Sequence, residues 1–208
     1  VSRIGGADRY ETAVKIARKL DWDESEVIFA SGENYPDALS VGPYAATESM
    51  PILLTRTDSL PDCVEDFIEG LEPGMSAVVA GGPAAVSEDV ITSLTKIKSG
   101  GTKVFGSDVE RVYGDTRYET AVELAKHFEL EAGDEDAIFI ATGEDYADAL
   151  TGAALASLND TGILLVRKNA VPSKVDRFLD ETGQELTILG GEAAVSLNNA
   201  VTLYDLIK

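Results

Sequence analysis

The six residues Arg9-Tyr10-Glu11-Thr12-Ala13-Val14 recur unchanged at residues 117–122 of the chain. Three further stretches recur in the same order after each of them, and the offset between equivalent residues stays between 108 and 111. They lie at 30–39, 52–54 and 81–87, and again at 141–150, 163–165 and 190–196. This period is too long for a solenoid unit and has the size of a whole small domain. We therefore predict a tandem duplication, with copy 1 in residues 1–108 and copy 2 in residues 109–208.

Within copy 1, short apolar runs alternate with segments of helical periodicity. Runs rich in Val, Ile and Leu predict buried strands, and the segments between them predict helices. The predicted strands lie at 27–31, 51–55, 77–80 and 103–105, and the predicted helices begin after Asp8, near Pro36, at Pro61 and after Ser87, the last running through Ile97. Continuous apolar strands separated by helices are typical of a parallel sheet covered on both faces. The sequence thus predicts an α/β fold of two tandem α/β three-layer sandwiches, each with a mainly parallel central sheet.

The segment before the first helix of each copy bears on the boundary between the copies. Both of these helices are predicted to begin with a capping box, in which two side chains satisfy free backbone N–H groups. The boxes are Asp8 with Glu11 and Thr116 with Glu119. Residues 2–4 and 109–113 occupy equivalent places just before them. We expect the strand before each box to belong structurally to the preceding copy, so that residues 2–4 are the tail of a missing domain.

The composition excludes several classes of function. The chain has 208 residues with 17 Lys and Arg against 37 Asp and Glu, which gives a formal net charge of −20. Such a surface repels phosphate backbones and anionic headgroups, so we expect no nucleic acid partner and no basic membrane patch. We also expect no membrane insertion, because no run of about 18 apolar residues occurs. One cysteine and one histidine cannot form an internal disulfide, a His-rich metal site or a catalytic triad in each copy.

Four ordered motifs, each present twice, resemble the cell-wall-binding repeat 2 family. The resemblance covers roughly residues 3 to 200. Copy 2 departs from copy 1 at Tyr113, Thr116 and Ala147, which stand where copy 1 has Gly5, Asp8 and Pro36. The motifs of copy 1 are Gly6-Ala7-Asp8-Arg9-Tyr10-Glu11-Thr12-Ala13, Ser31-Gly32-Glu33-Asn34-Tyr35-Pro36-Asp37-Ala38-Leu39-Ser40, Pro51-Ile52-Leu53-Leu54 and Gly81-Gly82-Pro83-Ala84-Ala85-Val86-Ser87.

The resemblance implies a non-catalytic anchoring module of a secreted protein, located outside the cell at the cell wall or cell surface. Its partner would be a cell wall polysaccharide or anionic glycopolymer, bound non-covalently and without cofactor or metal. Repeats of this family often come in threes, pack into a compact triangular arrangement and bind polymer in grooves between domains. This chain shows two repeats, which suggests self-association or a third repeat. Two rival hypotheses are a glycan-active enzyme that uses paired carboxylates such as Glu33 and Asp37, and a self-assembling component of a surface layer (S-layer).

One group of candidate ligand-binding residues lies at and before the first helix of each copy. An Arg guanidinium can hold a carboxylate or phosphate with two hydrogen bonds, and a Tyr ring can stack on a sugar. Alternatively, the arginines pair with a buried Asp37 or Asp148 and the tyrosines belong to the core. Just upstream, a second pair of arginines lies nearer the junction of the copies. The residues of this group are Arg9, Tyr10, Arg117 and Tyr118, together with the upstream Arg3 and Arg111.

The second group lies in the loop between the first strand of each copy and the next helix. Ligands of parallel α/β sheets bind at the carboxyl ends of strands, which is where this loop is expected. Its polar and aromatic side chains suit sugar hydroxyls or a calcium ion, although the alternating acidic spacing of a dedicated calcium loop is missing. A third interpretation is that they only form the turn and cap the helix. The residues are Asn34, Tyr35 and Asp37, with Asp145, Tyr146 and Asp148 in copy 2.

Other residues that resemble catalytic or phosphate-binding groups have simpler interpretations. The Gly-Gly pairs at 81–82 and 190–191 fit neither a P-loop nor a dinucleotide-binding motif, so we interpret them as tight turns. His127 aligns with Lys19, and Cys63 aligns with Lys174, which indicates helix surface in both cases. We therefore predict no catalytic residue.

The acidic composition conflicts with an anionic ligand. Three explanations remain open: arginines concentrated in one groove, divalent cations that bridge like charges, or a source organism that lives in concentrated salt, where screening shortens the repulsion. Only nine lysines accompany the 37 acidic residues, which favours a halophile.

Overall fold

The structure, a computed structural model, describes residues 1–23, 25–128 and 137–207. It divides into two compact units. Unit 1 comprises Val1–Ala38 and Glu48–Val112, and unit 2 comprises Leu39–Thr47 and Tyr113–Lys208. Both are built from helices and a parallel sheet, so the predicted fold class is confirmed. The division of the sequence repeat between residues 108 and 109 stays a prediction.

Unit 1 holds a four-stranded sheet in the order β2-β1-β3-β6, in which all neighbouring strands are parallel. Helix α2 begins in this unit and continues in unit 2. A small hairpin of β4 and β5 follows α4. The elements are α1 (Arg9–Ala17), β1 (Glu26–Ser31), α2 (Pro36–Thr47), β2 (Ile52–Thr55), α3 (Asp62–Ile68), β3 (Ser76–Ala80), α4 (Glu88–Leu94), β4 (Lys98–Ser99), β5 (Thr102–Lys103) and β6 (Val109–Val112).

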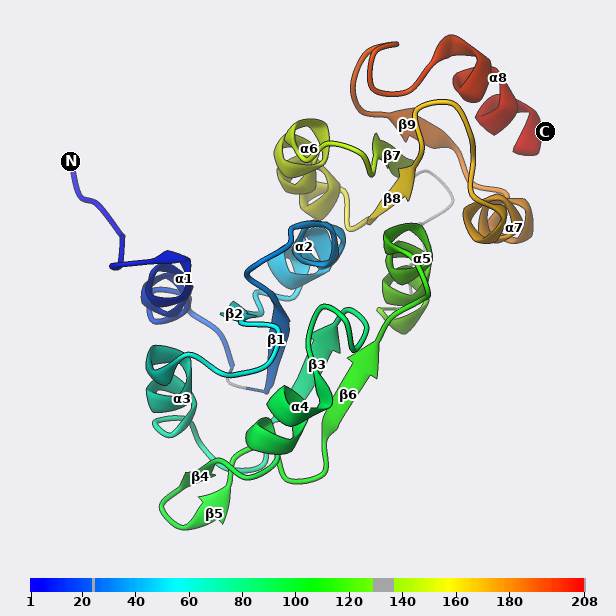
Figure 1. The fold of residues 1–208 in the computed structure, drawn as a ribbon. Coiled ribbons are helices and arrows are strands. Elements are labelled where there is room, and N and C mark those ends of the chain that lie inside the picture. The colour runs from blue at the N-terminus through cyan, green and yellow to red at the C-terminus, as the bar shows by residue number, and fades with distance from the viewer. Residues whose placement is uncertain (24, 129–136, 208) are drawn as a thin grey trace. The chain divides into compact units, whose positions relative to one another are not determined.

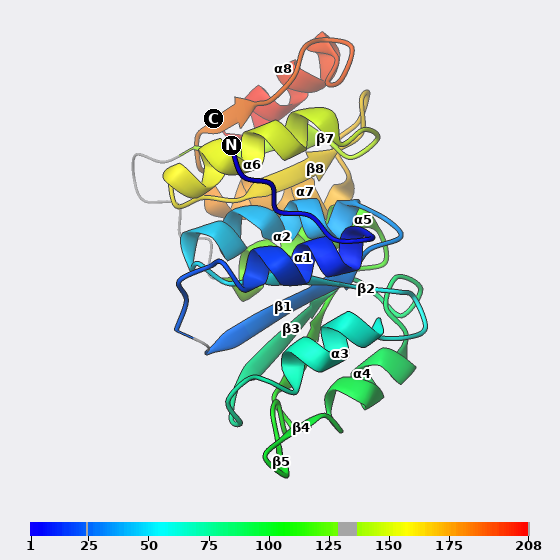
Figure 2. The same ribbon diagram turned by 90° about the vertical axis from the view of Figure 1, so that its left-hand side faces the viewer.

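The core of unit 1 lies between its sheet and the helices α1, α3 and α4. Alternate side chains of a strand point to the same face, and Val27, Phe29 and Val79 all point into this cluster. Phe29 meets Phe105 edge to face, with 5.7 Å between the ring centroids. Figure 2 shows α3 and α4 in front of strands β1 and β3. Burial of this one face fixes the sheet against three helices.

Strand β6 confirms that the strand before a capping box completes the preceding copy. It runs parallel to β3, with Arg111 opposite Val79 and Val112 opposite Ala80. The chain therefore contributes β6 to unit 1 before it enters unit 2 at Tyr113.

Unit 2 holds a three-stranded parallel sheet in the order β8-β7-β9, and β9 lies at its edge within the described residues. Helix α6 packs on β7 and β8, while α5 packs on β8 and contacts α7, and α7 contacts α8. Figure 1 shows α6 on one side of β7 and β8, with α5 and α7 on the other. The elements are α5 (Arg117–His127), β7 (Ile138–Thr142), α6 (Ala147–Leu158), β8 (Ile163–Val166), α7 (Ser173–Thr182), β9 (Leu186–Ile188) and α8 (Leu197–Leu206).

The end of copy 1 differs from the sequence prediction. Helix α4 ends at Leu94, three residues before the predicted end, because the chain turns there into the β4–β5 hairpin. Strand β5 ends at Lys103, and Phe105 leaves the predicted strand to enter the core. Ser87 does occupy the N-cap position of α4, but its side chain makes no cap hydrogen bond.

None of the described helices is both long enough and apolar enough to cross a membrane.

Candidate functional site

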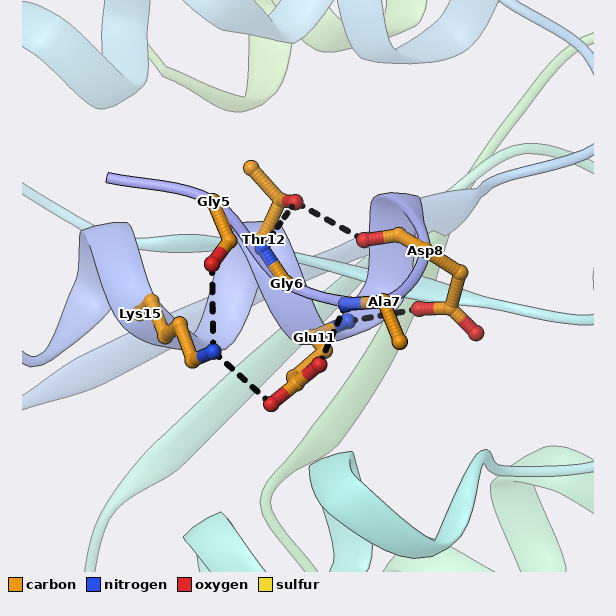
Figure 3. Close-up of polar contacts among 7 residues, drawn as sticks. All are labelled: Gly5, Gly6, Ala7, Asp8, Glu11, Thr12 and Lys15. Atoms are coloured by element: carbon orange, nitrogen blue, oxygen red, sulfur yellow. Dashed lines mark hydrogen bonds and ion pairs between the residues drawn. The ribbon is translucent and has the colours of Figure 1, made fainter. Parts of the chain in front are cut away.

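The first helix of unit 1 begins with the predicted capping box (Figure 3). The Asp8 carboxylate accepts a hydrogen bond from the Glu11 N–H at 2.9 Å, and the Glu11 carboxylate accepts one from the Ala7 N–H at 2.5 Å. The Thr12 hydroxyl accepts from the Gly6 N–H and donates to the Asp8 carbonyl. These four bonds fix the chain that leads into α1, and hence the position of its first residue, Arg9.

Helix α5 of unit 2 begins in the same way. The Thr116 hydroxyl accepts from the Glu119 N–H at 3.3 Å, and the Glu119 carboxylate accepts from the Asp115 N–H at 3.0 Å. The Thr120 hydroxyl accepts from the Gly114 N–H, as Thr12 does from Gly6. The capping box is therefore confirmed in both units, although Thr replaces Asp at the second N-cap.

The arginine after each cap reaches the carboxyl end of the first strand. Arg9 Nη1 donates to the carbonyl of Gly32 at 2.5 Å, and Arg117 Nη1 donates to the carbonyl of Gly143 at 2.6 Å. A backbone carbonyl thus holds each guanidinium where strands β1 and β7 end. The repeated sequence Arg-Tyr-Glu-Thr produces a repeated contact.

A second arginine, which the sequence analysis missed, completes each group. Arg56 directly follows β2, and its guanidinium carbon lies 4.9 Å from the centroid of the Tyr10 ring. Arg167 directly follows β8 and lies over the Tyr118 ring at the same distance, 4.9 Å. The signal was present, since both arginines follow the repeated Ile-Leu-Leu strand at the same offset. We call Arg9, Tyr10 and Arg56 the first arginine–tyrosine site, and Arg117, Tyr118 and Arg167 the second.

The tyrosine of each site is a core residue and also the support of an arginine. Tyr10 and Tyr118 are each only 6% exposed. A Cβ atom on Gly32 would lie 2.5 Å from the Tyr10 ring, and one on Gly143 would lie 2.7 Å from the Tyr118 ring. The strand end must therefore be glycine for the ring to pass this close.

The second arginine–tyrosine site opens into a hollow of about 560 Å³. Two guanidinium groups and one carboxylate face this volume, which is large enough for a sugar residue and its substituents. The lining residues are Thr116, Arg117, Tyr118, Gly143, Glu144 and Arg167. In a chain of net charge −20, such a place with surplus positive charge suits an anion.

The loop residues predicted from the sequence lie beside these strand ends. The Asn34 side chain accepts from the Tyr35 N–H at 3.0 Å, and the Asp145 side chain accepts from the Tyr146 N–H at 2.6 Å. These bonds fold the loop, which agrees with the turn-forming interpretation. Tyr35 and Tyr146 are both exposed at the surface.

Asp37 and Asp148 lie against the Gly-Gly turns. A Cβ atom on Gly81 would come within 2.6 Å of the Asp37 carboxylate, and Gly190 has the same relation to Asp148. Gly81 and Gly190 have φ angles of +114° and +103°, which glycine adopts without strain. The Gly-Gly pairs therefore form tight turns that make room for a carboxylate.

The arginines upstream of the capping boxes differ from each other. The Arg111 side chain is 10% exposed and donates to the carbonyls of Gly81 and Val86, at 2.9 and 2.7 Å, and to the Glu88 carboxylate at 3.0 Å. Arg3 is exposed in a segment without regular secondary structure. A role in ligand binding stays a prediction for both.

The free cysteine and the acidic side chains were also candidates for a reactive thiol or a metal site. Burial raises the pKa of the Cys63 thiol, and the nearby charges of Asp8 and Glu11 raise it further, so the thiol stays protonated at neutral pH. Among the described residues, no group of three or more His, Cys, Asp and Glu side chains is placed to hold a metal ion.

Residues 3–91 and 111–200 each match the family of cell wall binding domain 2. The chain belongs to this family. The two matched segments coincide with the two copies of the sequence repeat and contain both arginine–tyrosine sites. With two such domains, the chain is a cell wall binding module.

This cell wall binding module is similar to parts of longer proteins. It is 31% identical over 207 residues to the amidase enhancer of Bacillus subtilis, and 28% identical over 197 residues to the N-acetylmuramoyl-L-alanine amidase LytC of the same organism. These matches span 99% and 94% of the chain but only 26% and 37% of the two proteins.

Solved structures of cell wall proteins also contain a part that is similar to this chain. Cwp6 from Clostridium difficile matches 98% of the chain with a TM-score of 0.82 and 27% identity. Cwp8 from the same organism matches 98% with a TM-score of 0.81 and 30% identity. The chain covers 31% and 33% of those two proteins, so it corresponds to about a third of each.

Proposed function

We propose that this module is non-catalytic and binds an anionic cell wall glycopolymer non-covalently through its two arginine–tyrosine sites. The observation that carries the proposal is the repetition of one geometry. In each copy, a buried tyrosine supports an arginine at 4.9 Å, and a second arginine is held at the end of the neighbouring strand.

The distribution of positive charge supports an anionic ligand. The chain contains eight arginines, and four of them belong to these two sites. This concentration favours one of the three explanations for an acidic protein with an anionic partner, namely arginines gathered against an acidic exterior. A guanidinium presents planar, paired N–H donors that match a carboxylate or phosphate group of a polymer.

The size and position of the sites suit a repeating polymer. The hollow of about 560 Å³ at the second site is in the range of pockets for small ligands. The loops that follow the same strands expose Tyr35 and Tyr146, whose rings can stack on sugars. Two sites on one chain would engage two places on one polymer, which raises the overall affinity without new contacts.

A binding role fits the site better than the rival enzyme hypothesis. Glu33, one of the paired carboxylates of that hypothesis, accepts a hydrogen bond from the Thr57 hydroxyl at 2.7 Å, and Asp37 lies against the Gly81 turn. Neither arrangement is that of an acid and a base across a substrate. Since the chain spans only 26–37% of the relatives that it matches, we propose that it supplies attachment and that other parts of a longer protein supply activity.

Sedimentation with isolated cell walls tests the proposal. The chain should sediment with intact walls and stay in solution after the secondary polymers have been extracted. Arg56→Ala with Arg167→Ala should reduce the bound fraction about tenfold or more, because charged hydrogen bonds are lost at both sites. Arg177→Ala removes the same charge from the exposed surface of α7 and should bind like wild type. Binding that survives extraction, or release of new reducing ends, would contradict the proposal.

We further propose that the module works extracellularly at the cell wall, and that its acidic surface is suited to concentrated salt. Repulsion among 37 acidic side chains is screened within a few ångströms at about 1 M salt. The free energy of unfolding should rise between dilute buffer and molar potassium chloride. An equal stability in both would contradict the halophile proposal and leave wall binding unaffected.

A further inference from the structure

A second hollow lies in unit 1, at the end of α1 opposite to Arg9. Helices α1 and α3 contact each other (Figure 1), and the hollow lies where both of them end. Its volume is about 460 Å³, which is in the range of pockets for small ligands. All of its lining residues belong to unit 1, and none of them is part of the first arginine–tyrosine site.

The buried part of the lining is apolar. Ala17, Phe67 and Leu71 belong to the core of unit 1 and are between 1% and 7% exposed. Trp22 lines the same hollow, is half-buried and packs against this core. An aromatic ring beside apolar atoms suits a ligand with an apolar face, such as the C–H face of a sugar ring.

The rest of the lining carries hydrogen-bonding groups of both kinds. The carboxylates of Asp21 and Asp66 are acceptors, whereas the Arg18 guanidinium and the Trp22 indole N–H are donors. Within the described part of the chain, these four side chains make no hydrogen bond and no ion pair. The Arg18 guanidinium carbon lies over the Phe67 ring, 5.7 Å from its centroid. Four polar groups therefore line the hollow with their hydrogen-bonding capacity unused by the described protein.

The mixture of donors and acceptors favours a neutral ligand over an ion. Two carboxylates against one guanidinium give the lining a formal charge of −1, and the carboxyl ends of two helices add partial negative charge, which disfavours an anion. A cation would pair with Asp21 and Asp66 but would leave the donors of Arg18 and Trp22 unused. A hydroxyl group both donates and accepts, so a ligand with several hydroxyl groups satisfies all four side chains together.

The equivalent place in copy 2 keeps the helix packing but not these polar residues. Lys126 Nζ lies 6.0 Å from the centroid of the Phe178 ring, as the equivalent arginine does over its phenylalanine in unit 1. Arg177 stands at the place of Asp66, and Leu130, which lies outside the described residues, stands at the place of the tryptophan. The pair of helices therefore forms without the carboxylate of α3, and the packing alone does not account for the polar residues of copy 1.

We propose that this hollow binds one neutral sugar residue, a pyranose, with its C–H face against Trp22. The hydroxyl groups of the sugar donate to Asp21 and Asp66 and accept from the Arg18 guanidinium. The ligand is uncharged, which distinguishes the hollow from the two arginine–tyrosine sites. The proposal goes beyond the attachment of an anionic polymer and does not depend on it.

Fluorescence tests the proposal directly, because Trp22 is the only tryptophan of the chain. The full chain would be titrated with methyl glucoside and with N-acetylglucosamine, and at least one of these neutral sugars should change the emission in a saturable way. Glucose 6-phosphate and glucosamine carry a charge on the same ring and should bind about tenfold more weakly or less. An emission that neither neutral sugar changes, or tighter binding of either charged sugar, would overturn the proposal.

Substitutions locate the sugar. Asp66→Ala should weaken its binding about tenfold or more, because hydrogen bonds to a charged acceptor are lost. Asp89→Ala removes the same charge from the exposed first turn of α4 and should bind the sugar like wild type. An Asp66→Ala variant with unchanged sugar binding would contradict the proposal.

A further variant separates this hollow from the proposed polymer sites. Arg56→Ala with Arg167→Ala should lose the wall polymer and keep the full response of Trp22 to the sugar, while Asp66→Ala should keep the polymer. A sugar response that is lost in the double arginine variant would place the sugar at the arginine–tyrosine sites and overturn the proposal.

Discussion

The two copies are alike where the chain approaches the arginine–tyrosine sites and differ where their sheets end. Both first helices begin with a capping box, both tyrosines lie under an arginine at 4.9 Å, and both strand ends are glycine. The sheets, by contrast, have four strands in unit 1 and three in unit 2 among the residues that the structure describes. The contacts of the arginine–tyrosine sites are common to both copies. The sheets differ because unit 1 includes strand β6, which comes from the segment just before the second capping box.

The largest expected change in the free energy of unfolding comes from a substitution in the core of unit 1. Phe29→Ala should lower the free energy of unfolding by about 3–5 kcal/mol, since Phe29 is fully buried and packs edge to face on Phe105. Ile16→Ala, at an exposed position of α1, should change it by less than about 0.5 kcal/mol. Urea unfolding followed by fluorescence measures both. A loss below about 1 kcal/mol for Phe29→Ala would show that this cluster does not hold unit 1 together.

The next largest loss of stability is expected from substitutions that each disturb one arginine–tyrosine site and leave the other intact. Gly143→Ala places a methyl group against the Tyr118 ring and should cost about 1–3 kcal/mol of stability. Gly32→Ala should do the same at Tyr10, so the two copies can be compared directly. Gly191→Ala has no atom within 4 Å of the added carbon and should cost less than about 0.5 kcal/mol. Thermal unfolding of the three variants distinguishes a required glycine from a tolerated one.

A smaller effect concerns a tyrosine that copy 2 lacks. Tyr44 stands where copy 2 has Leu155, and its hydroxyl is buried without a hydrogen-bond partner among the described residues. Tyr44→Phe should therefore stabilise the protein by up to about 1 kcal/mol, because an unsatisfied polar group is removed. A clear loss of stability would indicate that the hydroxyl has a partner.

The same residue predicts a dependence on alkaline pH. Burial raises the pKa of Tyr44 above its ordinary value of about 10, so the folded state favours the neutral phenol. This contribution is complete below pH 10 and is lost as the pH rises through the folded-state value. Wild type should therefore lose stability above about pH 10 more steeply than Tyr44→Phe does. Parallel curves for the two proteins would contradict the assignment.

The smallest effect distinguishes the two capping boxes. Hydrogen bonds from the Ala7 N–H and from Lys15 lower the pKa of Glu11, whereas copy 2 has Glu123 at the place of Lys15. A lowered carboxyl pKa stabilises the fold above the unfolded value of about 4.3 and is lost as the pH falls through the folded value. Glu11→Gln should therefore flatten the acid limb of a stability curve. Lys15→Ala should flatten it only in part, because the hydrogen bond from the Ala7 N–H remains. An acid limb that Lys15→Ala leaves unchanged would show that Lys15 contributes nothing to this box.

The sequence predicted the fold well because the duplication tested each pattern twice. Both capping boxes and the strands near 27–31 and 51–55 follow from local side-chain patterns, and the structure confirms them. The predicted end of α4 was wrong, because the position where the helix ends depends on a hairpin turn and on the burial of Phe105, and not on helical periodicity. Such tertiary effects leave no periodic signal in a single sequence.

The candidate site was predicted less completely than the fold. The pattern drew attention to Arg9 and Arg117, but the stacking of Arg56 and Arg167 on buried tyrosines joins residues that are 46 and 49 positions apart in the sequence. Only the strand order brings these segments together. The repeated arginine after each Ile-Leu-Leu strand was the available signal.

The most direct test of the account compares the two sites in one binding experiment. Wild type, Arg56→Ala, Arg167→Ala and the double variant would be titrated with the extracted wall polymer by calorimetry, with Arg177→Ala as control. Each single variant should bind more weakly than wild type, because one of two linked contacts is lost, and the double variant should lose binding by about tenfold or more. Full binding by the double variant would contradict the claim that the two arginine–tyrosine sites hold the polymer.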